Sequence, residues 1–271
     1  MLPDLPDDVI FEEVVVTPRS STLPLPDLRR IERPGWVQVV TPSFRQGGFN
    51  EVAFSALADD EADAVIDATI AEYRALGIKF RWAVPPGSAP ADLGARLVRH
   101  GLVESWGRGM ARSTAAAAPT PSAARPGQFH DDDDQDPAVR VEEIGPDQIE
   151  TFTRVMAEGW RLDPGPLRVA HAVLFGMADR RQRQFLASYD GEPAGCASYV
   201  AFPRSAYLLG AVVLPPFRGR GLYRALARAR MADARARGIA LATAHAREAT
   251  SAPILERLGF ATICRFPIYF G

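Results

Sequence analysis

Along the C-terminal half of the chain, segments in which apolar residues recur at every second position follow segments in which they recur at helical spacing. The pattern predicts strands at residues 139–141, 184–189, 194–202, 207–214, 239–244 and 261–269. Apolar residues at helical spacing predict helices at residues 149–160, 167–177, 221–237 and 252–258. Asp190-Gly191 is a turn dipeptide typical of hairpins, and Pro215-Pro216 ends a strand because proline has no N–H to donate. The alternation of strands and helices predicts an α/β fold.

The N-terminal half carries a shorter version of the same order. Strands are predicted at residues 37–40, 52–54 and 80–84, and helices at residues 61–76 and 91–100. Leu76-Gly77-Ile78 joins a helix to a strand, as Arg237-Gly238-Ile239 does in the C-terminal half. The repeated order of helix, strand, helix, glycine and strand predicts an internal duplication.

The composition changes sharply between the two halves. Residues 114–137 hold a run of alanines, several prolines and four successive aspartates. Such a segment buries too little apolar surface to offset the entropy of ordering, so we expect an exposed linker. We therefore predict a domain at residues 1–112, a linker at residues 113–137 and a second domain at residues 138–271.

The composition narrows the function by exclusion. The 271 residues are 47% hydrophobic and 24% charged, with a formal net charge of −2, as in an ordinary soluble globular protein. No apolar run approaches the roughly 18 residues of a membrane helix, and the first residues lack the pattern of a secretory signal, so a cytoplasmic location is expected. The charge balance gives no general attraction for nucleic acid or for a membrane. Lys79 is the only lysine among 31 basic residues, so the many arginines reflect a general bias.

Neither the cysteines nor the histidines indicate a metal site. Cys196 and Cys264 each lie in an apolar, strand-like stretch, which favours two small buried hydrophobic residues over a disulfide. The four histidines are scattered and show no metal-ligand spacing. His171 lies in a largely apolar helix, where a core histidine is the favoured interpretation. The tryptophans are expected mainly in the core: Trp36, Trp82, Trp106 and Trp160.

The sharpest local signal is a strand that ends in a loop with two glycines and leads directly into a helix. Gly219 and Gly221 lie in this loop, with arginines on either side of them. Unpaired backbone N–H groups at a helix N-terminus and the positive end of the helix dipole bind anions such as a pyrophosphate. Neither the Gly-Lys-Ser/Thr ending of a P-loop nor the third glycine of a dinucleotide-binding loop is present.

These residues resemble a known family. The run Val213-x-Pro215-x-Phe217-Arg218-Gly219-x-Gly221-Leu222, followed by a helix, a strand and Leu258-Gly259-Phe260, is similar to the coenzyme A motif of the GNAT superfamily of N-acyltransferases. The resemblance covers residue 139 to the C-terminus. It implies a mixed, mostly antiparallel sheet flanked by helices, whose two central strands splay apart to admit acyl-CoA. Together with the repeated order, it implies two tandem copies of this fold.

The resemblance also implies site residues and partners. Backbone groups of Ala211, Val212 and Val213 bind the pantetheine and polarise the acetyl carbonyl. The pyrophosphate lies against the loop and the helix start, formed by Arg218, Gly219, Arg220, Gly221, Leu222, Tyr223 and Arg224. Acetyl-CoA is the implied acyl donor, and the acceptor is an amine of a small molecule or a peptide. No metal, nucleic acid or membrane is implied, and either a monomer or a homodimer is compatible with the pattern.

The sequence departs from the family where proton transfer is expected. The tyrosine that protonates the leaving thiolate falls at Leu255, and the usual asparagine falls at Glu248. Tyr223, at a position where the family has glycine or alanine, is a candidate replacement for the acid; an aromatic side chain packed beside the loop is the alternative interpretation of this residue. Tyr207, a water molecule and the low proton affinity of the thiolate itself are the other possibilities for this step. His245 and Glu248 follow the strand predicted at residues 239–244 and are the candidate bases.

The N-terminal half lacks the glycine loop. Residues 58–63 are rich in carboxylates at the corresponding helix start and would repel a pyrophosphate. We expect a degenerate copy that does not bind CoA and instead packs against the substrate groove of the active domain or forms one wall of it. Two functions stay open: an acetyl-CoA-dependent N-acetyltransferase acting through the C-terminal domain, and a non-catalytic acyl-CoA-binding regulatory module.

Overall fold

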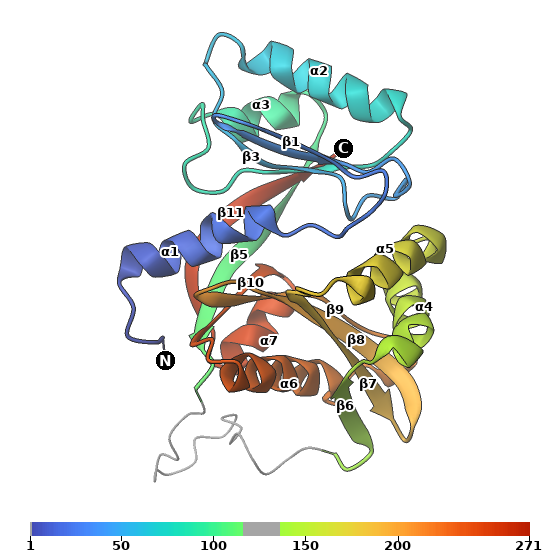
Figure 1. Ribbon diagram of the computed structural model, residues 1–271. Coiled ribbons are helices and arrows are strands. Elements are labelled where there is room, and N and C mark those ends of the chain that lie inside the picture. Colours follow the sequence, from blue (N-terminus) through green and yellow to red (C-terminus); the bar gives the residue numbers. More distant parts are fainter. Residues whose placement is uncertain (1, 116–135) are drawn as a thin grey trace.

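A single continuous sheet organises the molecule (Figure 1). The computed structural model describes residues 2–115 and 136–271, so most of the predicted linker lies outside the described residues. Within these ranges, eleven strands pair in the order β1-β2-β3-β4-β11-β5-β10-β9-β8-β7-β6. Most neighbouring pairs are antiparallel, whereas β3–β4 and β9–β10 are parallel. The fold is therefore the mixed, mostly antiparallel sheet with flanking helices that the resemblance implied.

Each half supplies its own set of elements. The N-terminal half contains α1 (Asp7–Val15), β1 (Arg29–Arg33), β2 (Trp36–Val40), β3 (Glu51–Ser55), α2 (Ala62–Ala75), β4 (Arg81–Ala83), α3 (Leu93–Arg99) and β5 (Val103–Ser113). The C-terminal half contains β6 (Val139–Glu143), α4 (Ile149–Trp160), α5 (Pro164–Gly176), β7 (Gln182–Tyr189), β8 (Glu192–Ala201), β9 (Ser205–Val213), α6 (Leu222–Ala236), β10 (Leu241–Arg247), α7 (Ser251–Arg257) and β11 (Ala261–Phe270).

The two halves share one connectivity. In the N-terminal half, β3 leads through α2 to a parallel strand, β4, and then through α3 to the long strand β5. In the C-terminal half, β9 leads through α6 to the parallel strand β10, and then through α7 to the long strand β11. The order of elements read from the sequence therefore recurs as the same topology in space.

The two halves exchange their last strands. β5 pairs with β10 of the C-terminal half, and β11 pairs with β4 of the N-terminal half. β5 and β11 also pair with each other, in the centre of the sheet. Strands of 11 and 10 residues are long enough, at about 3.4 Å per residue, to reach both halves. Neither half is complete without a strand from the other.

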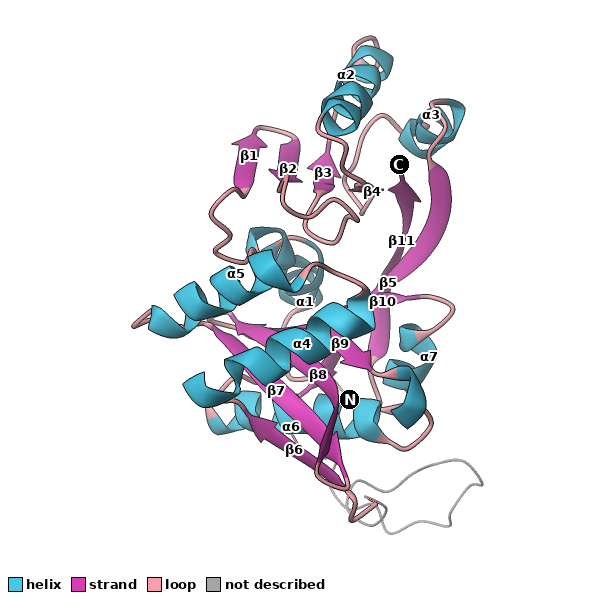
Figure 2. Cartoon of the chain, turned by 90° about the vertical axis from the view of Figure 1, so that its right-hand side faces the viewer, coloured by secondary structure: helices cyan, strands magenta, loops and turns pink. Residues whose placement is uncertain are grey.

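Helices cover both faces of the C-terminal part of the sheet (Figure 2). Phe185, Ala197 and Tyr199 pack in one cluster with α6. Their neighbours Leu186 and Cys196 point the other way and pack with α4 and α5. This alternation follows from the two-residue period of a strand. Both faces of the sheet carry apolar side chains because helices cover both of them. We call these two sides the α6 face and the α4 face.

The sequence placed most elements but missed α1 and β1. It predicted β5 only as the last strand of the repeated order, without bounds, because β5 is polar and glycine-containing and has no clear strand pattern. Two tryptophans also differ from the prediction. Trp36 and Trp82 are buried, but Trp106 is 40% and Trp160 36% exposed, because both lie beside a cavity that the chain leaves open. Cys196 is buried, Cys264 is partly exposed, and both are free thiols.

Among the described residues, no helix is both long and apolar enough to cross a membrane.

The close packing of α1 on β5 yields a stability prediction. A Cβ atom at Gly109 would lie 2.5 Å from a methyl carbon of Val14 and 2.8 Å from the Cys264 sulfur. Gly109→Ala therefore overpacks the contact between α1, β5 and β11, and we expect it to lower the free energy of unfolding by about 1–3 kcal/mol in urea denaturation. Gly176→Ala is the control, since a Cβ there meets nothing within 4 Å. Equal midpoints for the two variants would contradict this packing.

Candidate functional site

The site is a gap where two central strands separate. β9 and β10 pair in parallel over four residues, from Ser205–Leu241 to Leu208–Ala244, and then diverge. Beyond that point no described strand pairs with the edge of β9 that faces β10. A cavity of about 2380 Å³ opens there, with walls from both halves of the chain. The gap leaves backbone polar groups open to a ligand, as edge strands do.

A bulge in β9 lies directly beyond the divergence. The pairing with β8 shifts between Ser198–Leu209 and Cys196–Val212, and Gly210 has a φ of 65°. This left-handed backbone suits glycine, which has no Cβ to clash. Ala211, Val212 and Val213, which the resemblance assigned to the cofactor, follow and line the cavity.

A buried arginine holds the bulge from the α6 face. Arg230 is 1% exposed and donates hydrogen bonds to the carbonyls of Ser198 at 3.0 Å and Leu209 at 3.5 Å. Burial lowers its pKa to about 10, so the guanidinium is still charged at neutral pH. Among the described residues it has no ion pair with a carboxylate. Its charge therefore makes the electrostatic potential at the gap between β9 and β10 more positive.

The glycine loop forms a cradle at one end of the cavity. Gly219 and Gly221 have φ values of 82° and 81°, and α6 begins at Leu222. Within the described residues, the backbone N–H groups of residues 219–223 donate to no acceptor. A Cβ at Gly219 would meet nothing within 4 Å, so the loop has room for a ligand. Orphan N–H groups at a helix start fit a pyrophosphate.

The flanking arginines differ in position. Arg218 and Arg224 line the cavity, whereas Arg220 does not and stacks on the ring of Tyr189 at 4.5 Å. The side chain of Leu222 is buried in the core, so only its backbone faces the loop. Arg220 is thus the one residue of the predicted pyrophosphate set that the structure turns away.

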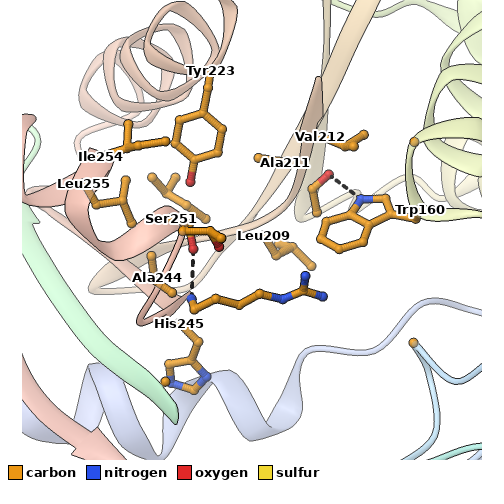
Figure 3. Close-up of a pocket in the computed structure, with 18 of the residues that line it drawn as sticks. Trp160, Leu209, Ala211, Val212, Tyr223, Ala244, His245, Ser251, Ile254 and Leu255 are labelled. Carbon is orange, nitrogen blue, oxygen red and sulfur yellow. Dashed lines mark hydrogen bonds between the residues drawn. The ribbon is translucent and has the colours of Figure 1, made fainter. Parts of the chain in front are cut away.

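Tyr223 points from the first turn of α6 into the cavity (Figure 3). Its hydroxyl has no hydrogen-bond partner among the described residues. Burial raises the pKa of the phenol, and the charge of Arg230 opposes this only in part. The hydroxyl therefore keeps its proton at neutral pH. Leu255, at the position where the resemblance puts the family's tyrosine, lies nearby in the same view.

His245 lies at the first position of β10 beyond the paired residues. Its Nε2 donates a hydrogen bond to the carbonyl of Val14 in α1 at 2.8 Å, which leaves the lone pair on Nδ1. The ring packs edge-on against Tyr207 at 5.3 Å and Phe266 at 5.2 Å. Desolvation by these surroundings lowers the pKa of His245, despite the opposing bond to Val14. A neutral imidazole with a free nitrogen is a potential proton acceptor.

Glu248, the other candidate base, lies outside the cavity lining. It forms ion pairs with Arg108 at 3.0 Å and Arg265 at 2.8 Å. Desolvation alone would raise the pKa of Glu248, but the hydrogen bonds from these arginines outweigh it and lower the pKa. The structure thus brings Tyr223 and His245 to one cavity and keeps Glu248 in an ion-pair cluster.

His171 is the core residue that the sequence indicated. It is 1% exposed, and its Nδ1 lies 2.8 Å from the hydroxyl of Thr153. Burial lowers its pKa to about 4, so it is neutral at physiological pH. Among the described residues, no three histidine, cysteine or acidic side chains are placed to hold a metal ion.

Trp160 lies in the site, whereas the sequence favoured core packing for it over a substrate-facing position. α4 lies so close to β9 that a Cβ at Gly159 would be 2.5 Å from a methyl carbon of Val212. This close approach holds the next residue over the bulge, where the Trp160 indole N–H donates to the carbonyl of Gly210 at 3.4 Å (Figure 3). A glycine beside a tryptophan at a helix end is the only local signal for such an arrangement.

The N-terminal half forms a wall of the cavity, but its described residues include no glycine loop at a helix start that could bind an anion. Lys79 and Arg81 from this half line the cavity. The carboxylates at the start of α2 bind α3 instead of capping α2: Asp63 contacts Arg96 and His100, each at 2.8 Å. These acids therefore serve packing between the two helices.

Comparisons with known proteins agree with this geometry. Residues 147–260 match the model of the acetyltransferase (GNAT) family. No curated protein matches the chain.

Solved structures share the fold over almost the whole chain. A GCN5-related N-acetyltransferase from Kribbella flavida is 15% identical, with a TM-score of 0.62, and the match covers 98% of this chain and 94% of the other. A functionally unknown conserved protein from Staphylococcus epidermidis is 11% identical, with a TM-score of 0.62 and coverage of 95% and 98%. A tandem GNAT protein from the clavulanic acid biosynthesis pathway is 14% identical, with a TM-score of 0.54 and coverage of 98% and 95%. The matched region contains the diverging strands and the loop at the start of α6, and it leads to one conclusion: residues 147–260 form a domain that matches the acetyltransferase (GNAT) family.

Proposed function

We propose that the protein transfers an acetyl group from acetyl-CoA directly to a primary amine, through its C-terminal half. The observation that carries this proposal is one cavity with unpaired N–H groups at residues 219–223 and with Tyr223 and His245 beside the point where β9 and β10 diverge. Acetyl-CoA would supply the activated thioester. The acceptor is a small molecule or a peptide.

The chain's own groups divide the work of binding. The N–H groups of the loop and the charges of Arg218 and Arg224 hold the pyrophosphate at the start of α6. Backbone groups of Ala211, Val212 and Val213, which lie on the part of β9 that has diverged from β10, bind the pantetheine arm and polarise the carbonyl. Such positioning converts an encounter of two molecules into a reaction within one complex.

Two side chains move the protons. His245 accepts at Nδ1 the proton that the amine loses as its nitrogen bonds to the acetyl carbon. Tyr223 donates its hydroxyl proton to the sulfur as the carbon–sulfur bond breaks. Both roles match the groups' states at neutral pH, since the imidazole is neutral and the phenol protonated.

The second candidate is a non-catalytic acyl-CoA-binding regulatory module. Leu255 favours it, because a hydrocarbon cannot protonate a thiolate. The tyrosine that enters the cavity from α6 favours the enzyme. The division into residues 1–112, 113–137 and 138–271, the cytoplasmic location and a monomeric or homodimeric state stay predictions, as do the absence of nucleic-acid, membrane and metal partners.

The loop assignment is tested by Gly221→Asp. The variant places a side chain at a φ of 81° and a negative charge at the start of α6, so we expect calorimetric titration to show acetyl-CoA binding weakened by at least about tenfold. Gly238→Asp is the matched control, with a similar φ of 79° at the opposite end of the helix. Equal loss in both variants, or no binding by the unmodified protein, would contradict the assignment.

The proton-donor role is tested by Tyr223→Phe. Removal of the hydroxyl deprives the leaving sulfur of its acid, so we expect kcat for thiol release to fall about 100-fold with acetyl-CoA affinity unchanged. Tyr269→Phe removes a hydroxyl that binds Glu104 outside the cavity, and it should leave kcat unaltered. A Tyr223→Phe enzyme with normal kcat would assign the acid to another group.

The base role is tested by the pH dependence of kcat. Protonation of His245 abolishes its lone pair, so activity falls as the pH drops through its pKa. Because desolvation lowers that pKa, we expect the fall below about pH 6.5, with a plateau at neutral pH. In His245→Gln the plateau rate drops and the acid limb disappears. An unchanged limb in this variant would exclude His245 as the titrating group.

A further inference from the structure

We propose that the acceptor amine carries a carboxylate, which Arg247 binds on the α4 face of the sheet. This inference rests on the proposed acetyl transfer and names its substrate class. It is carried by the position of Arg247 beside Trp160 and by the distribution of charge in the cavity.

Arg247 lies on the same side of β10 as the candidate base. Ala244 and Ala246 pack in the cluster that contains α6. The residues between and after them, His245 and Arg247, therefore point to the α4 face, since successive side chains of a strand alternate. Their Cα atoms are about 6.7 Å apart by strand geometry. A single acceptor can thus reach both residues.

The guanidinium of Arg247 is held across the mouth of the gap. Its central carbon lies 5.3 Å from the ring centroid of Trp160, which is itself bonded to Gly210 in the bulge of β9. The backbone N–H of Arg247 donates to the Ser251 hydroxyl at 2.8 Å (Figure 3). A cation–π contact of this kind does not occupy the N–H donors of a guanidinium with an acceptor. Among the described residues, no acceptor binds these N–H groups.

The acidic side chains that line the cavity do not neutralise the positive charge around Arg247. Of the described residues that line the cavity, Glu51 and Glu256 carry the only acidic side chains, and they are paired with Arg81 and Arg108. Lys79 and Arg161 also line the cavity and form no ion pair with a described residue. Arg161, next to Trp160, has a left-handed backbone with φ 55°.

This positive charge is distinct from that of the phosphate loop. Arg218 lies between β9 and α6, and Arg224 lies in the first turn of α6, which covers the opposite face. A second set of cations on the α4 face would repel a polyamine and offers nothing specific to a plain alkylamine. A planar carboxylate matches the paired N–H donors of a guanidinium. The surplus charge therefore favours an amino acid as acceptor.

The test measures turnover of three four-carbon amines by the full-length protein: 4-aminobutyrate, butylamine and 1,4-diaminobutane. Homologues of each amine with two to six carbons extend the comparison to other lengths. We expect kcat/KM to be at least about tenfold higher for aminoalkanoates than for the matched alkylamines, and lowest for the diamines. Arg247→Ala should remove the advantage through KM, changing alkylamine kinetics less than about threefold. Arg247→Glu should reverse the preference toward diamines.

Controls separate this inference from the proposed function. Arg235→Ala removes an exposed arginine outside the cavity lining and should leave the preference intact. Calorimetry confirms that each variant binds acetyl-CoA like the unmodified protein. Turnover with equal or higher efficiency for alkylamines or diamines would overturn the carboxylate assignment while leaving acetyl transfer intact. An equal reduction of kcat/KM for all three amines in Arg247→Ala would likewise overturn the carboxylate assignment. Failure of acetyl-CoA binding would overturn both proposals.

Discussion

The separation of β9 from β10 is the constraint on which the rest of the structure depends. Two neighbouring strands that stop pairing leave backbone groups unsatisfied, and a sheet tends to close such a gap. Here Arg230 binds the carbonyls of Ser198 and Leu209 from one face. From the other face, α4 packs directly on Val212 through Gly159. The gap is therefore braced on both faces and presents fixed backbone donors without reorganisation, as electrostatic catalysis requires.

The exchange of last strands makes the N-terminal half part of this arrangement. β5 occupies the far side of β10 and keeps that strand from moving toward β9. α1 is anchored to the start of β9 by Glu13, which binds Arg204 at 2.7 Å. The same helix provides the Val14 carbonyl that orients His245. A half that lacks the glycine loop thus contributes the geometry of the candidate base and the cations of one cavity wall.

The two faces of the gap carry different chemistry. The α6 face holds the glycine loop, the buried guanidinium of Arg230 and the phenol of Tyr223, which suit phosphates and a developing negative charge on sulfur. The α4 face holds His245, Trp160 and Arg247, which suit an amine and its attached anion. In the proposed reaction, acetyl-CoA approaches from the α6 face and the acceptor from the α4 face, so the two need not compete for one entrance.

Local sequence sufficed for every feature that depends on a few neighbouring residues. The Asp190-Gly191 hairpin has φ values of 49° and 81°, and the glycine loop and the start of α6 lie where the pattern predicted, because turns and helix starts are set by nearby backbone chemistry. The polar strand β5, the exposure of Trp106 and Trp160, and the capture of Glu248 by arginines were beyond such patterns. Each arises from contacts between segments more than 100 residues apart or from the cavity that those contacts enclose. Nonlocal pairing and burial, which no window of sequence contains, decided which of the candidate residues meet in one site.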